Sequence, residues 1–325
     1  MRAFIQQSLV LVLLTVLSSC ASVKQLTAGR AMLNAENWVS HDGKIMPCKC
    51  WPVPAGGKPR GVVIAVHGLS GAKSDFWYLG EQLPPHGYTV YAYDLRGQGN
   101  DPVIAERGDI KKAAAWQHDL ATFHALVKRR HPHTPVFWYG ESLGSLITLH
   151  TAADLLSNRA DPDGIILATP IAGLRKALSG FQRFLLETAA KLSPRTRYTL
   201  GELAGVDESK IQVTSNSTLG NQMAVTPHHV PAFSLRLLST IGGMIDANPE
   251  SAHRLKMPVL FIASPNDVLS SADQIQSLFA EVRSRDKRLL WYTRSYHLLL
   301  HDVQREEVVH DVTHWLDRQV TASRR

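Results

Sequence analysis

The chain has 325 residues, of which 44% are hydrophobic and 19% charged, a balance typical of globular proteins that argues against a disordered chain or a repeat array. Its formal net charge is +7, but the basic residues form no long run and no aromatic-basic module, which argues against nucleic-acid binding. A modest positive charge suits contact with an anionic lipid surface or aids solubility.

Residues 1–19 have the pattern of a secretory signal peptide. Arg2 precedes an apolar run, residues 9–17, that is too short to span a bilayer comfortably. The sequence that follows, Leu17-Ser18-Ser19-Cys20, resembles a bacterial lipobox. The resemblance implies cleavage before Cys20 and lipidation of that cysteine. The alternatives are an uncleaved anchor and a plain secretory signal with an incidental cysteine.

A lipidated Cys20 would hold the protein on a membrane, since each buried methylene contributes about 0.8 kcal/mol. Ala21 and Ser22 follow, so the aspartate that resembles an inner-membrane retention signal is missing. We therefore expect a lipid-anchored protein of the cell envelope, on the outer membrane, facing the periplasm or the surface.

The other two cysteines, Cys48 and Cys50, are two residues apart. On a strand such residues share a face at roughly 6.6 Å between Cα atoms, so a mutual disulfide would be strained. We expect a structural role for both, and four-cysteine metal spacing is absent.

From Gly61 onward, short apolar runs alternate with helical stretches. The predicted strands are residues 61–66, 89–93, 136–139, 165–168, 259–263 and 288–292. The predicted helices are residues 76–83, 116–129, 143–156 and 303–316. This alternation predicts an α/β fold: a mostly parallel sheet with helices on both faces and ligand chemistry at the carboxyl ends of the strands.

The interval between Ala168 and Val259 is far longer than a crossover helix requires, so it must contain an insertion. Two stretches in it have apolar residues at helical spacing, which predicts an inserted helical cap. They are Phe181, Phe184, Leu185 and Leu192, and Phe233, Leu237, Leu238 and Ile241. Such stripes are usually packing faces, but a cap could also exclude water and form a groove for an apolar substrate tail.

These patterns divide the chain into five parts. They are a signal peptide (1–19), a lipidated linker (20–35), a first part of the α/β core (36–170), a helical cap (171–250) and a second part of the core (251–325).

The segment Gly140-Glu141-Ser142-Leu143-Gly144 has the Gly-x-Ser-x-Gly pattern of a nucleophile elbow. At such an elbow a strand turns sharply into a helix and lifts the serine hydroxyl into the cleft, and the flanking glycines allow strand and helix to approach closely. The pattern alone is weak, because glycine-flanked serines also occur at ordinary turns. Here a predicted strand precedes it and a predicted helix follows, so Ser142 is the candidate nucleophile.

A serine hydroxyl needs a base within hydrogen-bond reach and a carboxylate that orients the base. In this fold the order along the chain is serine, acid, histidine. Asp267 follows the strand 259–263 and His297 follows the last strand, so both are expected at the carboxyl edge of the sheet. Asp273 competes for the acid role, but it falls in the following helix.

His301, four residues after His297, is the closest rival for the role of base. The two histidines have a zinc-binding spacing, yet the glutamate of the metalloprotease motif is missing, so no metal and no cofactor is predicted. For the oxyanion, the expected donors are the backbone amides of Leu143, at a helix N-terminus, and Leu69, in the loop after the first buried strand. His67 is expected to brace that loop.

Five segments in order carry a family resemblance: His67-Gly68-Leu69-Ser70-Gly71, Tyr93-Asp94-Leu95-Arg96-Gly97-Gln98-Gly99, Gly140-Glu141-Ser142-Leu143-Gly144, Ser264-Pro265-Asn266-Asp267 and Tyr296-His297. Together, over about residues 60 to 318, they resemble the monoacylglycerol lipase and lysophospholipase branch of the α/β-hydrolases, related to serine aminopeptidases. Asp302 also resembles an acidic position of that family.

This sequence departs from the family pattern at two places. Gln98 stands where a histidine is common, and Asn100-Asp101 where a serine often lies, which puts fine loop contacts in doubt. Asp94 and Arg96 are expected to stabilise that loop.

The resemblance implies hydrolysis of a carboxylic ester through an acyl-enzyme, with a small-molecule or lipid ester such as a monoacylglycerol or lysophospholipid as substrate. A serine aminopeptidase or amidase is the second hypothesis, although no acidic cluster for the substrate amine is evident in the cap. A non-catalytic envelope lipoprotein that retains the fold is the third. Epoxide hydrolases and dehalogenases need an aspartate where Ser142 stands.

Overall fold

The computed structural model describes residues 31–55, 57–155, 161–175, 179–204, 207–218, 221 and 226–322. The predicted signal peptide and Cys20 lie outside these residues. No helix in the described ranges has both the length and the apolar character needed to cross a membrane.

The described strands are β1 (Met32–Leu33), β2 (Asn37–Val39), β3 (Ile45–Trp51), β4 (Gly61–Val66), β5 (Tyr88–Tyr93), β6 (Val136–Glu141), β7 (Gly164–Ala168), β8 (Arg197–Tyr198), β9 (Gln212–Thr214), β10 (Ser217–Thr218), β11 (Phe233–Ser234), β12 (Val259–Ala263) and β13 (Lys287–Trp291). The described α-helices are α2 (Trp77–Gln82), α3 (Ala113–Arg130), α4 (Leu143–Leu155), α5 (Gly180–Leu192), α6 (Leu200–Ala204), α8 (Leu235–Asp246), α9 (Asn248–Arg254), α10 (Ala272–Glu281) and α11 (Arg305–Ala322). Short 3-10 helices cover Lys73–Phe76, Pro84–His86, Ile104–Glu106, Glu208–Lys210 and Leu299–His301.

One central sheet organises the described chain, with the strand order β1-β2-β3-β5-β4-β6-β7-β12-β13. The pairs β1–β2, β2–β3 and β3–β5 are antiparallel, and every pair from β5 to β13 is parallel. The mostly parallel sheet is therefore as the sequence predicted. The antiparallel edge was not predicted, and its first strand, β1, falls in the stretch predicted as linker (20–35), where Leu33 is buried in the core.

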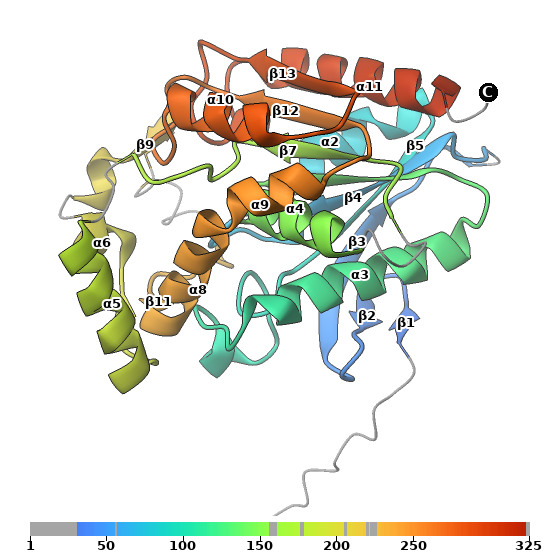
Figure 1. Cartoon of the computed structure of the whole chain (residues 1–325). Coiled ribbons are helices and arrows are strands. Elements are labelled where there is room, and N and C mark those ends of the chain that lie inside the picture. The colour runs from blue at the N-terminus through green and yellow to red at the C-terminus, as the bar shows by residue number, and fades with distance from the viewer. Residues whose placement is uncertain are drawn as a thin grey trace, which may run out of the picture.

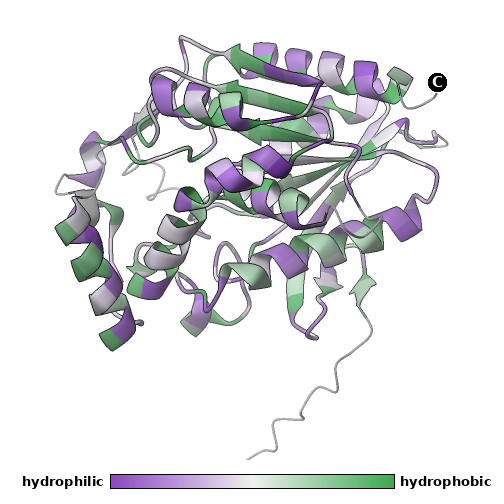
Figure 2. Cartoon of the chain, in the orientation of Figure 1, coloured by the Kyte–Doolittle hydropathy of each residue, from purple (hydrophilic) through white to green (hydrophobic). Residues whose placement is uncertain are grey.

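Each central strand is buried on both faces because its alternate side chains enter two separate cores. On β4, Val62 and Ile64 pack with residues of α3 and α4, whereas Val63 and Ala65 pack with residues of α2 and α11. Figure 1 shows α3 and α4 on one side of the sheet and α11 on the other, and in Figure 2 the central strands are coloured as hydrophobic. The helices on both faces thus match the prediction.

Residues between β7 and β12 form the predicted insertion, with α5 and α6 beyond one end of the sheet in Figure 1. The stripe predicted over residues 233–241 is a packing face, since Phe233 on β11 and Leu237 on α8 are buried. The stripe on α5 is not, because Phe181 is 70% and Phe184 is 61% exposed. Helical spacing indicated which residues share a face, but it carries no information on whether another element covers that face.

Cys48 and Cys50 lie on the antiparallel strand β3, and both are free thiols. Cys48 is buried and Cys50 half-buried, and burial raises the pKa of the Cys48 thiol to about 12. A protonated thiol is a weak nucleophile, so this cysteine is a packing residue.

Candidate active site

Ser142 occupies the sharp turn between β6 and α4. Its φ is 54°, a left-handed conformation that is strained for a residue with a side chain and is typical of functional sites. Gly144 permits this turn, because a Cβ built on it would lie 1.9 Å from the carbonyl oxygen of Val66. The strand-turn-helix context that the sequence predicted for Ser142 is therefore present.

His297 lies between Ser142 and Asp267. Its Nε2 atom is 2.9 Å from the Ser142 Oγ atom, and its Nδ1 atom is 2.9 Å from Asp267 Oδ2. Because the carboxylate accepts the Nδ1 proton, Nε2 is left to accept the serine hydroxyl proton. The structure thus brings together three side chains from positions 142, 267 and 297.

Two opposing effects act on His297. Burial lowers its pKa, but the charge and the hydrogen bond of Asp267 raise it, and the net pKa lies above the usual 6.5. A base with this pairing accepts a proton readily as Ser142 attacks.

The loop that carries His297 is fixed by residues whose roles were not predicted. Asn266 Nδ2 donates to the carbonyl oxygens of Thr293 (2.8 Å) and Ser295 (3.2 Å), and the Ser264 hydroxyl also donates to the latter. The segment Ser264-Pro265-Asn266-Asp267 therefore supplies both the acid and the side chains that hold the histidine loop. The position of this segment in the sequence indicated the acid, but its contacts with the loop after β13, as far as 31 residues along the chain, could not be inferred from it.

Asp302 has a related bracing role. Its Oδ2 accepts from the backbone amide of Tyr296 at 2.8 Å, and its Oδ1 accepts from the amide of Ser215 in the cap at 3.1 Å. The amide of Leu298 also donates to the carbonyl of Val213 at 2.9 Å. The cap is thus joined to the histidine loop on both sides of His297.

The rival residues lie elsewhere. His301 is half-buried in the 3-10 helix Leu299–His301, and its ring forms a hydrogen bond with the backbone of Asp75. Asp273 is exposed in the first turn of α10. Neither makes a hydrogen bond to Ser142 or His297 within the described ranges.

The backbone amides of Leu69 and Leu143 lie on the two loops beside Ser142. A Cβ built on Gly68 would be 3.1 Å from the Ser142 Cβ and 3.6 Å from its Oγ, so the loop after β4 passes close to the serine. Leu143 begins α4, where amides have no partner within the helix. Both amides are without a hydrogen-bond acceptor among the described residues and remain candidates for binding an oxyanion.

His67 holds this loop from inside, as expected. Its Nε2 accepts from the amide of Leu95 at 2.9 Å, so Nδ1 carries the proton and donates to the carbonyl of Gly68 at 2.8 Å. Burial lowers the pKa of His67, in keeping with this neutral tautomer. Asp94 and Arg96 also stabilise the neighbouring loop, since Asp94 accepts from Lys73 and Arg96 pairs with Asp119.

Glu141, next to Ser142, is buried, and its Oε2 atom has no hydrogen-bond partner among the described residues. Burial raises the pKa of this carboxyl to about 7, and the negative charge of Asp75 acts in the same direction. Glu141 is therefore protonated in mildly acidic solution.

This raised pKa predicts a pH dependence of stability. The folded state holds the Glu141 proton up to about pH 7, whereas the unfolded chain releases it near 4.5, so the free energy of unfolding falls as pH rises between these values. The fall is about 3 kcal/mol. In Glu141→Gln this contribution is absent, so urea unfolding should find the variant similar to the wild type at pH 4.5 and more stable at pH 8. The exposed Glu81→Gln is the control, and parallel curves for Glu141→Gln and the wild type would refute the prediction.

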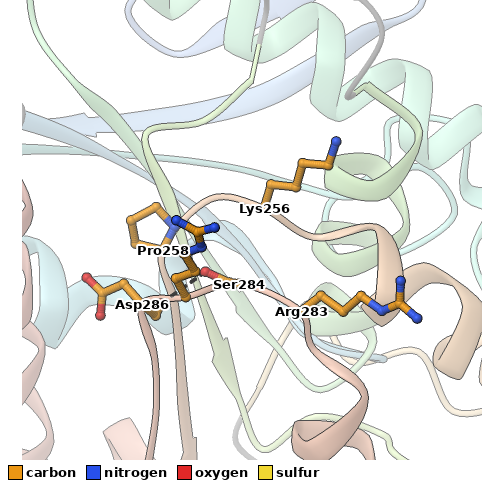
Figure 3. A pocket seen from close by; sticks show the side chains of 6 residues that line it. Lys256, Pro258, Arg283, Ser284 and Asp286 are labelled. Carbon is orange, nitrogen blue, oxygen red and sulfur yellow. Dashed lines mark hydrogen bonds between the residues drawn. The ribbon is translucent and has the colours of Figure 1, made fainter.

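A cavity of about 370 Å³ lies at the amino-terminal ends of β12 and β13, whereas Asp267 and His297 follow the carboxyl ends of these strands. Its lining residues are Lys256, Pro258, Arg283, Ser284, Arg285 and Asp286. In Figure 3, Pro258, Ser284 and Asp286 cluster while Lys256 and Arg283 extend away from them. None of these residues belongs to the cluster around Ser142.

Similar proteins include lipases and a phospholipase. A monoglyceride lipase of Mus musculus is 23% identical over 289 residues, which cover 88% of this chain and 91% of that protein. Phospholipase YtpA of Bacillus subtilis is 27% identical over 259 residues, which cover 77% of this chain and 93% of that protein.

Solved structures share the fold. A soluble variant of monoglyceride lipase from Saccharomyces cerevisiae, in complex with a substrate analog, superposes with a TM-score of 0.73 at 20% identity, covering 91% of this chain and 98% of that one. The monoacylglycerol lipase of Paleococcus ferrophilus gives a TM-score of 0.70 at 21% identity, covering 84% and 99%. The predicted α/β-hydrolase fold is confirmed. Residues 57–304 match the family described as serine aminopeptidase S33, and because this match spans most of the sequence, the chain belongs to that family.

Proposed function

We propose that the protein hydrolyses carboxylic esters through an acyl-enzyme on Ser142. The observation that carries the proposal is the placement of His297, which is 2.9 Å from both Ser142 Oγ and Asp267 Oδ2. Ser142 attacks the ester carbonyl while His297 takes the hydroxyl proton and then gives it to the departing alcohol. Asp267 orients His297 and stabilises its positive charge.

Negative charge develops on the carbonyl oxygen during the attack, and the amides of Leu69 and Leu143 are the proposed donors to it. A water molecule, deprotonated by His297, then attacks the acyl carbon and releases the acid, and Ser142 recovers its proton. No metal or cofactor is needed for these steps.

We propose a lipid with a single acyl chain as substrate, such as a monoacylglycerol or a lysophospholipid. The names of the similar proteins support this class. The cap supports it too, since the large apolar side chains of α5 lie exposed beyond the catalytic end of the sheet. An apolar acyl chain is the partner that such side chains favour.

The family description favours one alternative, an aminopeptidase, which would need a free carboxylate for the substrate amine. Two cap glutamates are already engaged with backbone amides. Glu202 accepts from Thr199 at 2.7 Å, and Glu208 accepts from Gly201 at 2.8 Å. The hydrolysis panel below distinguishes the two reactions.

A hydrolysis panel separates these functions. The full-length protein is assayed against esters of increasing chain length, monoacylglycerols, lysophospholipids and aminoacyl amides. We expect turnover of single-acyl esters to exceed that of the amides by at least about tenfold in kcat/KM, a difference of about 1.4 kcal/mol in transition-state binding. Preference for the aminoacyl amides would favour the peptidase, and no turnover together with no fluorophosphonate labelling would favour a non-catalytic lipoprotein.

We propose that cleavage before Cys20 and lipidation of this residue hold the protein in the cell envelope, on the outer membrane. A fatty-acid analogue supplied to bacteria that express the chain should label the wild type and not Cys20→Ser, and the variant should move to the soluble fraction. Cys50→Ser is the matched control and should keep the label. Labelling that survives Cys20→Ser would contradict the anchor.

A further inference from the structure

The segment His228–Val230 precedes α8 within the cap and lies against the loop that carries Leu69. Ser70, the residue after Leu69, accepts a hydrogen bond from the amide of Val230 at 2.9 Å. The Ser70 hydroxyl is also 2.7 Å from His229 Nδ1. The hydroxyl proton has two acceptors within reach, the carbonyl oxygen of Val230 at 3.2 Å and the nearer ring nitrogen of His229. Residues 159 positions apart are thus joined next to the candidate oxyanion donor.

A second contact lies a few residues farther on. His228 Nε2 is 3.3 Å from Asp75 Oδ1, and Asp75 Oδ2 accepts from the amide of Ala72 at 2.9 Å. Burial acts to raise the pKa of Asp75, but the hydrogen bonds from the His228 side chain and from the amide of Ala72 lower it below its usual value. Asp75 is therefore a charged acceptor for the cap.

The opposite side of the same loop is held by the core. The amide of Ser70 donates to Gln98 Oε1 at 2.9 Å, and the Gln98 side chain is fully buried. Ser70 has a φ of 61°, so its backbone is held in a left-handed conformation that these contacts must maintain. Leu69 thus lies between a core loop and a cap segment that both fix its neighbour.

Two buried donors in this cluster are left unpaired. Gln98 Nε2 and His229 Nε2 have no hydrogen-bond partner among the described residues. An unpaired buried donor costs stability, as does a positive φ at a residue with a side chain. A cluster with both features is more typical of a functional constraint than of one that serves stability alone.

We propose that His228–Val230 forms a clasp that positions the oxyanion loop through Ser70 and Asp75, so that the Leu69 amide is correctly placed only while the cap segment is seated. Ser70, Asp75, His228 and His229 are then positioning residues, because they act through the Leu69 amide and do not touch the reacting atoms. The proposal rests on the ester hydrolysis proposed above and names the device that couples the cap to that reaction.

Matched substitutions at His229 and His228 test the clasp. Asn places an oxygen where histidine has Nδ1, and Gln places a nitrogen where histidine has Nε2. His229→Asn and His228→Gln therefore keep the contacts with Ser70 and Asp75, whereas the two leucine variants lose them. Ser70→Gly removes the hydroxyl without adding strain at a φ of 61°. His310→Leu, an exposed position on α11, is the control.

The measured quantities are kcat, KM, the Ki of a trifluoromethyl ketone and the thermal midpoint. Ser142 adds to the ketone carbon and His297 takes its proton, so the alkoxide oxygen of the adduct occupies the oxyanion site. We expect His229→Leu, His228→Leu and Ser70→Gly each to lower kcat and raise Ki about 10- to 100-fold, with KM changed less than about threefold. The Asn and Gln variants should recover most of the loss.

A merely structural role would move the thermal midpoint while leaving kcat and Ki of the folded fraction unchanged, and that result would overturn the proposal. So would a rise in KM alone. The rate at which a fluorophosphonate labels Ser142 gives a readout that needs no natural substrate, and it should fall in the same ratio as kcat. If the wild type hydrolyses esters and Ser142→Ala does not, then unchanged kcat and Ki in His229→Leu and His228→Leu refute the clasp and leave the proposed function standing. If the wild type hydrolyses no ester, the proposed function fails first.

Discussion

Replacing Ser142 by alanine is expected to lower kcat for ester hydrolysis by about 10⁶-fold, to the background of the assay. The reason is that His297 would keep its contact with Asp267 but have no hydroxyl to activate, so no acyl-enzyme can form. KM should change little, because the hydroxyl contributes little to the binding of the ground state. The measurement is the initial rate with a single-acyl ester, with near-unchanged unfolding showing that the variant is folded.

A serine control distinguishes loss of the nucleophile from loss of any serine. Ser277 is exposed on α10, and Ser277→Ala should keep the wild-type rate. A fluorophosphonate probe should label the control and not Ser142→Ala. Hydrolysis that persists in Ser142→Ala would place the chemistry at another residue.

Replacing Asp267 by asparagine is expected to lower kcat by about 10⁴-fold at neutral pH. Asp267 accepts the Nδ1 proton of His297 and also accepts from the backbone amide of Leu269 at 2.7 Å. An asparagine amide at this position would donate to Nδ1, which places the remaining ring proton on Nε2. That tautomer cannot take a proton from Ser142.

The same substitution should alter the pH profile. His297 must be neutral to act as a base, so kcat/KM rises as pH rises through its pKa. Burial lowers this pKa and Asp267 raises it, with a net value above 6.5. The acidic limb of the wild-type kcat/KM profile, where the rate rises with pH, therefore lies above pH 6.5. Without the charge of Asp267 the limb should move to lower pH. Asp273→Asn, at an exposed position, is the control, and an unchanged limb in Asp267→Asn would contradict the assigned pairing.

Much of the core could be predicted because each buried parallel strand is a short run of apolar residues that is visible in the sequence. The strands β4 and β12 have the predicted bounds, and both consist of apolar residues that enter a core on each face. Helix α3 begins at Ala113 rather than at residue 116, because alanines 113–115 carry little of the apolar periodicity that marks a helix.

The antiparallel edge of the sheet and the exposure of the α5 face were harder to predict from the sequence. β1 and β2 are only two and three residues long, too short for a periodic signal. The stripe on α5 has the spacing of a packing face, yet it is exposed. Periodicity gives the geometry of one element, whereas burial depends on where the rest of the chain lies.

The sequence by itself predicted the parallel core, the turn at Ser142 and the choice of Asp267 and His297 over their rivals, because apolar runs and the succession of motifs are read directly along the chain. Only the tertiary structure decided how these residues are held. Asn266 fixes the histidine loop, Ser70 meets His229, and Glu141 is left without a partner for its Oε2 atom among the described residues. Such contacts join side chains that are distant in sequence, and hydrogen bonds of this kind leave no periodic trace from which they could be inferred.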